Sequence, residues 1–325
     1  MSRPRVCFFA QVRTREELQR VEFYAQDLRV FADLGFEVRT AIRPQELRSA
    51  DLYFVWWWTW AFIPVAFAKT ARRPVIVTGV FDYWLYPSRP LPHRLLHQYA
   101  LRAAAANVFV STFEHREVPQ HLRVRNPQCV PLGIDTVIYR PGGLEREELV
   151  FTTAKMARGN GVRKCIAEII RAAALVHRSR PNVRFVIAGE VDPIYVDLVR
   201  EFEAGEYVHF PGVIARETKV ALMQRCQVYL QPTRFEGFGL AIAEAMACGA
   251  PVVTSAQGAV PEVVGDAGVF VDGRSPEEIA TGVVALLSDD CRRRDLSRRG
   301  RERVESRFSY DRHKREWAAV IESVL

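Results

Sequence analysis

The sequence predicts an α/β fold made of two doubly wound, Rossmann-like domains that face each other across a cleft. Short apolar runs alternate with helical stretches along the chain, as parallel strands with helical crossovers require. A polar segment at 139–148 interrupts the alternation and is typical of a domain linker. The chain has 325 residues, 49% of them hydrophobic, which is enough for two domains with cores of their own.

The first domain is expected to span 1–144. Its strands are short runs rich in apolar and β-branched residues, at 6–10, 36–41, 52–57, 75–78, 108–111 and 129–131. Helices are expected over 16–34, ended by Gly35, and near 93–105. The stretch 52–68 is uncharged for 17 residues, but Pro64 lies inside it, which favours a buried strand leading into a helix over a membrane span.

The second domain is expected to span 145–305 and to repeat this scheme. Its predicted strands are 150–153, 183–188, 208–210, 228–231, 252–254 and 269–271, with helices at 163–177 and 276–287 among them. Ligands of doubly wound sheets bind beyond the carboxyl ends of the strands. We therefore expect the chemistry in the cleft between the domains.

Charge and cysteine usage narrow the function classes. The formal net charge of +7 favours an anionic partner, and nucleoside diphosphates, acidic lipid surfaces and nucleic acid all fit that sign. No motif interleaves aromatic and basic residues as nucleic-acid binders do, so we expect no nucleic-acid partner. Six cysteines without paired spacing indicate reduced thiols in a cytoplasmic protein. The apolar stretch at 6–10 is too short for a signal peptide.

The segment 236–251 is the most informative part of the chain. It follows an apolar run and opens an alanine-rich helical segment that stops at Gly249. The first amides of a helix lack internal partners and favour a nearby anion by about 0.3–2 kcal/mol. Gly237 and Gly239 allow a ligand close to the backbone, and Glu236 and Glu244 can accept hydrogen bonds from hydroxyls. A phosphate site beside hydroxyl acceptors is typical of sugar-nucleotide binding.

Several segments of the chain form one pattern: 130–141, Lys155 and Lys164, 187–189, 210–213, 236–244 and 252–268. Together they resemble the retaining glycosyltransferases of family 4, which have the GT-B fold. The resemblance covers about 130–288 and is weak before that. It implies transfer of a sugar from a nucleoside-diphosphate sugar to a hydroxyl of an unidentified acceptor, which could be a glycan, a lipid-linked glycan or a small-molecule natural product.

The resemblance also implies a role for each matched residue. Glu236 would contact hydroxyls of the donor sugar, and Glu244 would contact the ribose. The amides of Phe238, Gly239 and Leu240 would contact the diphosphate, with Gly237 also at the donor. Val213 would lie near the nucleobase. Lys155 and Lys164 would stabilise charge on the leaving phosphate, and with Glu236 they form the expected catalytic set. The family usually has arginine where this chain has Lys155; Arg158 and Arg163 lie nearby and leave the register of the basic pair open.

Neither a metal nor a cofactor is expected. The chain contains no Asp-x-Asp motif, and Asp289 and Asp290 stand at a helix end without supporting ligands. Retaining transfer in such proteins is thought to use the departing diphosphate as the base, so no protein nucleophile is required. Protein cations would then replace magnesium at the diphosphate.

The first domain departs from the family pattern in two places. A glycine-rich loop is missing after the first strand, and Arg13 is the expected substitute at the donor phosphates. Near the family's sugar-contacting histidine this chain has Phe81 and Asp82. A phenyl ring there suggests a donor without a 6-hydroxyl, such as a 6-deoxyhexose or pentose, and a misalignment is the competing explanation.

Aromatic residues cluster at two strand ends of the first domain. Alternate residues of a strand face opposite sides, so some of these rings must belong to the core. Others, with Trp57 and Trp58 as the candidates, would line the acceptor or sugar pocket by stacking on sugar rings.

The end of the chain carries two further expectations. By the same resemblance, 306–325 forms a helix that packs back on the first domain, with Trp317, Val320 and Ile321 on its apolar side. Dense arginines between Arg292 and Arg315 are either solvated helix faces or a peripheral contact with acidic lipid at the inner membrane surface.

A sugar-nucleotide 2-epimerase and a catalytically silent nucleotide-sugar-binding protein are the alternative functions.

Overall fold

The computed structural model describes residues 3–81, 83–143, 145–157 and 159–325, and the chain forms two compact units. Unit 1 contains Met1–Gly133 and Tyr310–Leu325, and unit 2 contains Ile134–Ser309. The sequence placed its domain limits at 144/145 and 305/306, inside unit 2 by this division. Each unit is described below by itself.

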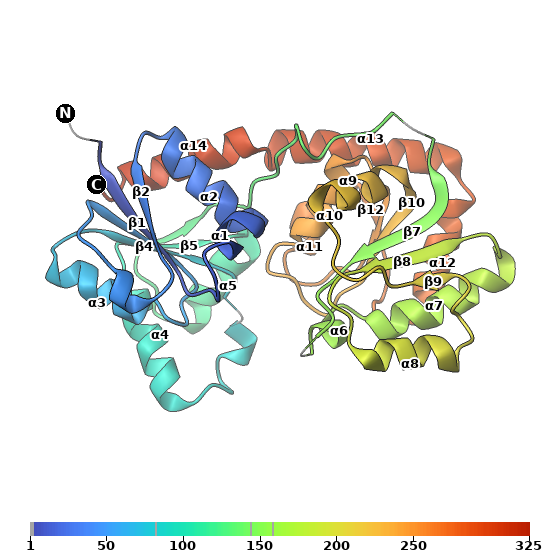
Figure 1. The fold of residues 1–325 in the computed structure, drawn as a ribbon, viewed down its shortest axis with the longest axis horizontal. Helices are drawn as coiled ribbons and strands as arrows, with labels where there is room; N and C mark the ends of the chain where they lie inside the picture. The colour runs from blue at the N-terminus through green and yellow to red at the C-terminus, as the bar shows by residue number, and fades with distance from the viewer. Residues whose placement is uncertain (1–2, 82, 144, 158) are drawn as a thin grey trace. The chain divides into compact units, whose positions relative to one another are not determined.

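Unit 1 is built on a six-stranded sheet in which every pair of neighbours is parallel (Figure 1). The strands are β1 (Arg5–Ala10), β2 (Glu37–Ala41), β3 (Leu52–Trp56), β4 (Val75–Gly79), β5 (Ala106–Phe109) and β6 (Pro127–Cys129), in the order β2-β1-β3-β4-β5-β6. Every strand lies close to its predicted position. The predicted α/β class is confirmed.

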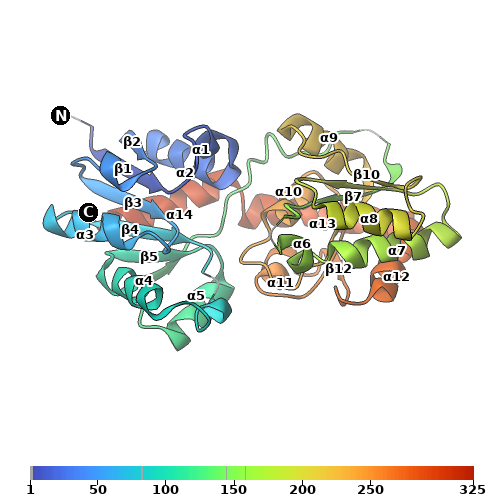
Figure 2. The same ribbon diagram turned by 60° about the horizontal axis from the view of Figure 1, so that its bottom comes forward.

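Helices cover both faces of this sheet (Figures 1 and 2). They are α1 (Glu17–Arg20), α2 (Glu22–Asp33), α3 (Phe62–Thr70), α4 (Leu91–Ala103), α5 (Thr112–His121) and α14 (Tyr310–Glu322), with short 3-10 turns η1 (Pro44–Glu46) and η2 (Tyr83–Leu85). The single helix predicted over 16–34 is wrong, because Val21 is extended (φ −84°, ψ 117°) and separates α1 from α2. The helices α2 and α14 pack together on one face, and α3 and α4 pack together on the other.

The closing helix α14 belongs to unit 1 and is fixed there by buried polar contacts. His313 lies 2.7 Å from the carbonyl oxygen of Pro131 and 2.9 Å from the carboxylate of Asp27 on α2. Trp56 donates a hydrogen bond of 2.9 Å to the other carboxylate oxygen of Asp27. The ring of Trp317 packs edge-on against Phe54, with 5.0 Å between centroids. Because all these groups are buried, the C-terminal helix is part of the core of unit 1.

Unit 2 has a second sheet of six parallel strands. They are β7 (Glu147–Thr153), β8 (Arg184–Ala188), β9 (Val208–His209), β10 (Cys226–Gln231), β11 (Val252–Thr254) and β12 (Gly268–Phe270), in the order β12-β11-β10-β7-β8-β9. The central pair, β7 and β10, is where the strand order reverses. The crossovers on either side run to opposite faces, which opens a crevice at the carboxyl ends of these two strands.

The helices of unit 2 form a layer on each face of its sheet (Figure 1). They are α6 (Asn160–Arg163), α7 (Ile166–Ser179), α8 (Pro193–Glu201), α9 (Arg216–Arg225), α10 (Leu240–Ala247), α11 (Val260–Val264), α12 (Pro276–Leu287) and α13 (Asp290–Arg307). The core on one face joins α7 and α12 to the sheet through buried aliphatic side chains such as Ile169, Val228 and Val283. Among the described residues, no helix is both long and apolar enough to cross a lipid bilayer.

Candidate active site

The start of α10 presents unpaired backbone amides at the carboxyl end of β10. Gly239 is the N-cap residue and has φ 99°, a left-handed conformation that favours glycine. In the described parts of the chain, the amides of Gly237, Phe238, Gly239 and Leu240 donate no hydrogen bond to protein acceptors. The ring of Phe238 is buried and packs edge-on against Phe308, and this contact holds the turn in place. Unpaired amides at a helix start are suited to phosphate oxygens.

Glu236 stands directly before this turn and is buried beside two cations. Its Oε1 accepts hydrogen bonds from the ammonium of Lys164 and, at 3.1 Å, from the guanidinium of Arg163. Burial alone would favour the protonated acid, but the charges of Lys164 and Arg163 outweigh it and lower the pKa of Glu236. The carboxylate is therefore ionised at neutral pH, and its Oε2 has no protein donor among the described residues.

The two cations are held in place through the backbone that carries them. The carbonyl oxygen of Arg163 accepts hydrogen bonds from Thr233 Oγ1 at 3.1 Å and from the amide of Arg234 at 2.8 Å. Cys165, the next residue after Lys164, has φ 52°, a left-handed conformation uncommon outside glycine. Strained backbone of this kind is often found at functional sites. The turn between α6 and α7 thus aims Lys164 at the loop after β10.

A glycine supports the site from the loop after β11. Gly258 has φ 60°, and a Cβ at this position would lie 2.2 Å from the carbonyl oxygen of Glu236. The amide of the following residue, Ala259, donates a hydrogen bond of 2.9 Å to that same oxygen. Glu236 is consequently fixed at both its side chain and its backbone, and any larger residue at 258 would push it away.

Glu244 is buried and paired with a lysine, and its predicted contact with the ribose stays a prediction. Its side chain is 2% exposed, and both carboxylate oxygens accept hydrogen bonds from Lys219 Nζ on α9, at 2.8 and 2.9 Å. The ammonium also lies 5.0 Å from the ring centre of Tyr139. The sequence analysis missed Lys219, because it lies far from the motif in the chain and no short spacing links it to Glu244.

Lys155 and Val213 lie in loops of unit 2 apart from this cluster. Lys155 follows β7, its side chain is 67% exposed, and its ammonium lies 3.7 Å from Glu190. Arg163, one of the two arginines that left the register of the basic pair open, lies beside Glu236; the other, Arg158, lies outside the described residues. Val213 is 76% exposed. The roles assigned to Lys155 and Val213 stay predictions.

The residues proposed in unit 1 have varied surroundings. Arg13 is exposed in the bend after β1, and Trp57 is half-buried after β3 with φ 76°. Trp58 is buried and donates a hydrogen bond of 2.9 Å to Asn107. Phe81 is also buried, with its ring next to those of Trp58, Tyr86 and His97. Asp82 lies outside the described residues. Burial favours packing roles for Trp58 and Phe81 and leaves Arg13 and Trp57 available to a ligand.

The arrangement in unit 2 can bind a polar anion and orient it. Bare amides would hold phosphate oxygens, the Lys164 and Arg163 pair would offset their charge, and Glu236 would accept a hydroxyl hydrogen bond through its second oxygen. Within the described residues, no group of three or more His, Cys, Asp or Glu side chains is placed to hold a metal ion.

Solved structures of low sequence identity share this fold. The sucrose-phosphate synthase of Thermosynechococcus elongatus superposes with a TM-score of 0.82 over 98% of both chains at 18% identity. HepE of Anabaena, in complex with UDP and glucose, gives a TM-score of 0.81 over 98% of this chain and 100% of its own, also at 18% identity. The fold is therefore GT-B, as the resemblance predicted.

Sequence comparison identifies relatives as well as a family. The MMP alpha-(1->4)-mannosyltransferase of Mycolicibacterium hassiacum is 28% identical over 81% of this chain and 62% of its own length. A GDP-mannose-dependent monoacylated alpha-(1-6)-phosphatidylinositol monomannoside mannosyltransferase of Corynebacterium glutamicum is 27% identical over 66% of this chain and 58% of its own. The chain thus spans less than two thirds of the length of these relatives. The family model described as glycosyl transferases group 1 matches residues 153–303, which contain Lys164, Lys219 and the Glu236–Glu244 segment, so the predicted resemblance to this family is confirmed over that range.

Proposed function

We propose that this protein transfers a sugar from a nucleoside-diphosphate sugar to a hydroxyl of an acceptor, with retention of the anomeric configuration and without a metal ion. One observation carries the proposal: an ionised, buried Glu236, paired with Lys164 and Arg163, stands directly before the unpaired amides of the α10 turn. A diphosphate and a sugar hydroxyl are the two ligand groups that this set can satisfy together.

The proposed reaction follows from what these groups can stabilise. The acceptor oxygen forms a bond to the anomeric carbon on the face that the diphosphate leaves, while the bond from that carbon to the phosphate oxygen breaks. The acceptor proton passes to the departing diphosphate, so no side chain need act as nucleophile or base. Negative charge grows on the leaving group, where the amides and the two cations lie. Removing one such preorganised donor typically costs about 2.7–4 kcal/mol of transition-state stabilisation.

The donor is proposed from the relatives' names. GDP-mannose appears in the name of the Corynebacterium relative, and UDP with glucose in the HepE complex. We propose a GDP- or UDP-linked hexose as the donor of this chain. The 6-deoxyhexose or pentose suggested by Phe81 is the competing donor class, but the burial of that ring weakens its premise.

A nucleotide-sugar panel tests the proposal. Thermal unfolding is measured with GDP, UDP and their hexose and 6-deoxyhexose conjugates, and release of nucleoside diphosphate is measured in parallel. Ligand at one hundred times its Kd stabilises a protein by about 2.7 kcal/mol, which a melting curve resolves readily. We expect one base to stabilise the protein and its hexose conjugate to be turned over. No stabilisation by any nucleotide would contradict the proposal.

The same panel separates the alternative functions. A 2-epimerase would convert the nucleotide sugar to an isomer with no acceptor present and would release little diphosphate. A silent binding protein would be stabilised by a nucleotide sugar but would neither release nor isomerise it.

The acceptor side adds a further proposal about location. A phosphatidylinositol mannoside, which is a membrane lipid, appears in the name of one relative. The cysteines are free, including buried Cys7, Cys165, Cys226 and Cys248, as in a reducing compartment. We therefore propose that the protein acts in the cytoplasm and makes a peripheral membrane contact through its basic surface.

A further inference from the structure

Helix α4 of unit 1 has an apolar face that points away from the core. The core side is formed by His97, Ala100, Leu101 and Ala103, which are buried. Leu91 and Leu95 are 63% and 62% exposed, and Tyr99 is 40% exposed; with Leu96 they cover the outward side. Residues four apart lie on one face of a helix, so Leu91, Leu95 and Tyr99 form a continuous row. A surface helix normally shows polar residues there, so this face is suited to a partner.

Cations border the row on the neighbouring elements. Lys69 at the end of α3 lines one hollow together with Leu95, Tyr99 and Arg102. The apolar row thus has a positive charge at its edge.

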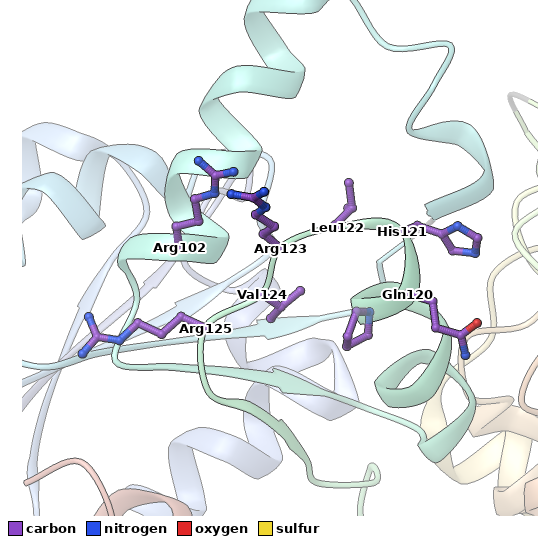
Figure 3. A pocket seen from close by; sticks show the side chains of 8 residues that line it. Arg102, Gln120, His121, Leu122, Arg123, Val124 and Arg125 are labelled. Carbon is purple, nitrogen blue, oxygen red and sulfur yellow. The ribbon is translucent and has the colours of Figure 1, made fainter.

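Arg102 also lines a second hollow, with Arg123 and Arg125 (Figure 3). In Figure 3 the side chains of Arg102 and Arg123 project toward the same side of this hollow. Two hydrogen bonds hold the segment of Arg123 and Arg125 against α4. Gln98 Nε2 donates one of 2.7 Å to the carbonyl of Arg123, and the amide of Arg125 donates one of 3.0 Å to the carbonyl of Leu101. The backbone of Arg123 and Arg125 is therefore fixed beside the C-terminal end of α4.

No acid offsets these charges among the described residues. Lys69, Arg102, Arg123 and Arg125 have no ion pair within the described part of the chain. From residue 52 to residue 113 the sequence contains six lysines and arginines and a single acid, Asp82. We call the four cations together with Leu91, Leu95, Leu96 and Tyr99 the α4 surface.

We infer that the α4 surface binds the face of an anionic lipid bilayer. Leucine and aromatic side chains on one helix face can enter the boundary between headgroups and acyl chains, while lysine and arginine beside them bind lipid phosphates. The inference rests on the proposed membrane contact but is independent of the proposed sugar transfer, because binding to vesicles requires neither donor nor acceptor.

Charge decides between a bilayer and a second copy of the chain as the occupant. Two copies meeting through this surface would bring their unpaired cations together, and like charges facing each other across an interface oppose association. An anionic bilayer offers complementary charge and an apolar interior at once. The apolar row alone would fit either occupant.

The basic helix α13 fits a bilayer less well than the α4 surface does. Its arginines are largely used inside unit 2: Arg298 pairs with Asp295 and Glu302, and Arg303 donates hydrogen bonds to the carbonyls of Glu262 and Val263. None of the exposed large hydrophobic side chains of the described residues lies on α13. The membrane contact is therefore assigned to α4 and not to the arginine-rich end of the chain.

Co-sedimentation of the full chain with vesicles tests this inference. Vesicles of phosphatidylcholine alone are compared with vesicles that also contain phosphatidylglycerol, at low salt and at 1 M salt. We expect binding to the anionic vesicles, weakened by salt because 1 M salt shortens the screening length to about 3 Å. Leu95→Glu with Tyr99→Glu, and separately Arg102→Glu with Arg123→Glu, should each lower the partition coefficient at least tenfold.

Matched controls place the same changes elsewhere. Ile194→Glu on α8 introduces an acid at an apolar residue that is 65% exposed, and Arg292→Glu with Arg294→Glu reverses two exposed charges on α13. Both controls should keep at least half of the wild-type partition coefficient. Far-UV circular dichroism checks that all variants are folded.

Three results would overturn the inference. The first is that the wild-type chain does not bind anionic vesicles at low salt. The second is that only the α13 pair abolishes binding, which would move the contact to that helix. The third is a dimer, detected by light scattering, that Leu95→Glu with Tyr99→Glu dissociates, which would make a second copy the occupant.

Discussion

The Glu236 cluster of unit 2 and the Phe81 cluster of unit 1 were both predicted to contact the donor sugar, yet they differ in kind. Glu236 is buried among cations, with a free oxygen beside unpaired amides. Phe81 is buried among other rings, and the two ring nitrogens of neighbouring His97 have no hydrogen-bond partner in the described part of the chain. The first cluster holds a buried carboxylate beside two cations. The second consists mainly of packed aromatic rings, with the buried carboxylate of Glu114 accepting a hydrogen bond of 3.0 Å from the Phe81 amide.

The physical difference lies in what each burial costs. A buried charge is unfavourable unless it is paired, and a pair that also leaves donors and acceptors unused suggests a ligand. A buried aromatic ring is favourable by itself and needs no ligand to explain it. Buried ion pairs next to unpaired backbone amides are therefore the better guide to the site of this protein.

The largest expected effect comes from Glu236. Glu236→Gln keeps the shape of the side chain but removes the charge that Lys164 and Arg163 face, and we expect donor turnover to fall by about 10³-fold, or about 4 kcal/mol. Initial rates of diphosphate release measure this. Arg178→Ala, an exposed basic residue near the far end of α7, is the control and should lose less than threefold. Wild-type turnover in Glu236→Gln would remove this residue from the reaction.

Lys164→Ala tests the same cluster from its cationic side. We expect it to lose most of the transfer activity and to keep its fold, because the small side chain leaves Arg163 beside Glu236. Circular dichroism and diphosphate release are measured on the same sample. Full activity with an intact fold would show that Lys164 serves only the ion pair.

The Lys219–Glu244 pair should contribute to stability. Lys219→Met leaves the nearly inaccessible Glu244 carboxylate without its cation, and we expect the free energy of unfolding to fall by about 3–5 kcal/mol. Urea denaturation measures the loss. Adding Glu244→Gln to Lys219→Met should restore part of it, since the uncompensated charge is then removed. A double variant no more stable than Lys219→Met would contradict the ion-pair explanation.

His97 gives the Phe81 cluster a pH dependence. Burial, with Arg89 and His93 adding positive charge, lowers the pKa of His97 from 6.5 to about 4. Below about pH 6.5 His97 takes up a proton in the unfolded chain but not in the folded one. The contribution of neutral His97 to the free energy of unfolding is therefore fully present above pH 6.5 and is lost as the pH falls toward 4. At pH 4.5 the loss should be about 2 kcal/mol. His97→Phe should show a smaller drop in unfolding free energy between pH 7 and 4.5 than the wild type; an equal drop would exclude His97 as its source.

The smallest expected effect is at Phe81. If the ring serves packing, Phe81→Leu should lower the free energy of unfolding by about 1 kcal/mol and change the ratio of hexose to 6-deoxyhexose turnover by less than threefold. Denaturation curves and the donor panel provide both numbers. A tenfold change in the ratio would restore the sugar-contacting role predicted from the sequence.

Sequence reasoning succeeded where the signal is local. The strands of both sheets follow from short apolar runs, because a strand buried on both faces has to be apolar throughout. The Glu236–Gly239 turn was recognised because an acid, two glycines and the start of a helix are neighbours in the chain. Sequence reasoning failed at Val21, where the helical pattern continues but the backbone is extended and divides α1 from α2.

The sequence by itself determined the fold class, the family resemblance and the glycine-containing turn at the start of α10. Only the tertiary structure decided that Arg163 joins Lys164 at Glu236, that Lys219 neutralises Glu244, and that Phe81 lies in a core. The reason is that periodicity and capping depend on residues a few positions apart, whereas the partner of a buried charge depends on how distant elements pack. Lys164 and Glu236 lie in two loops that the adjacent strands β7 and β10 bring together.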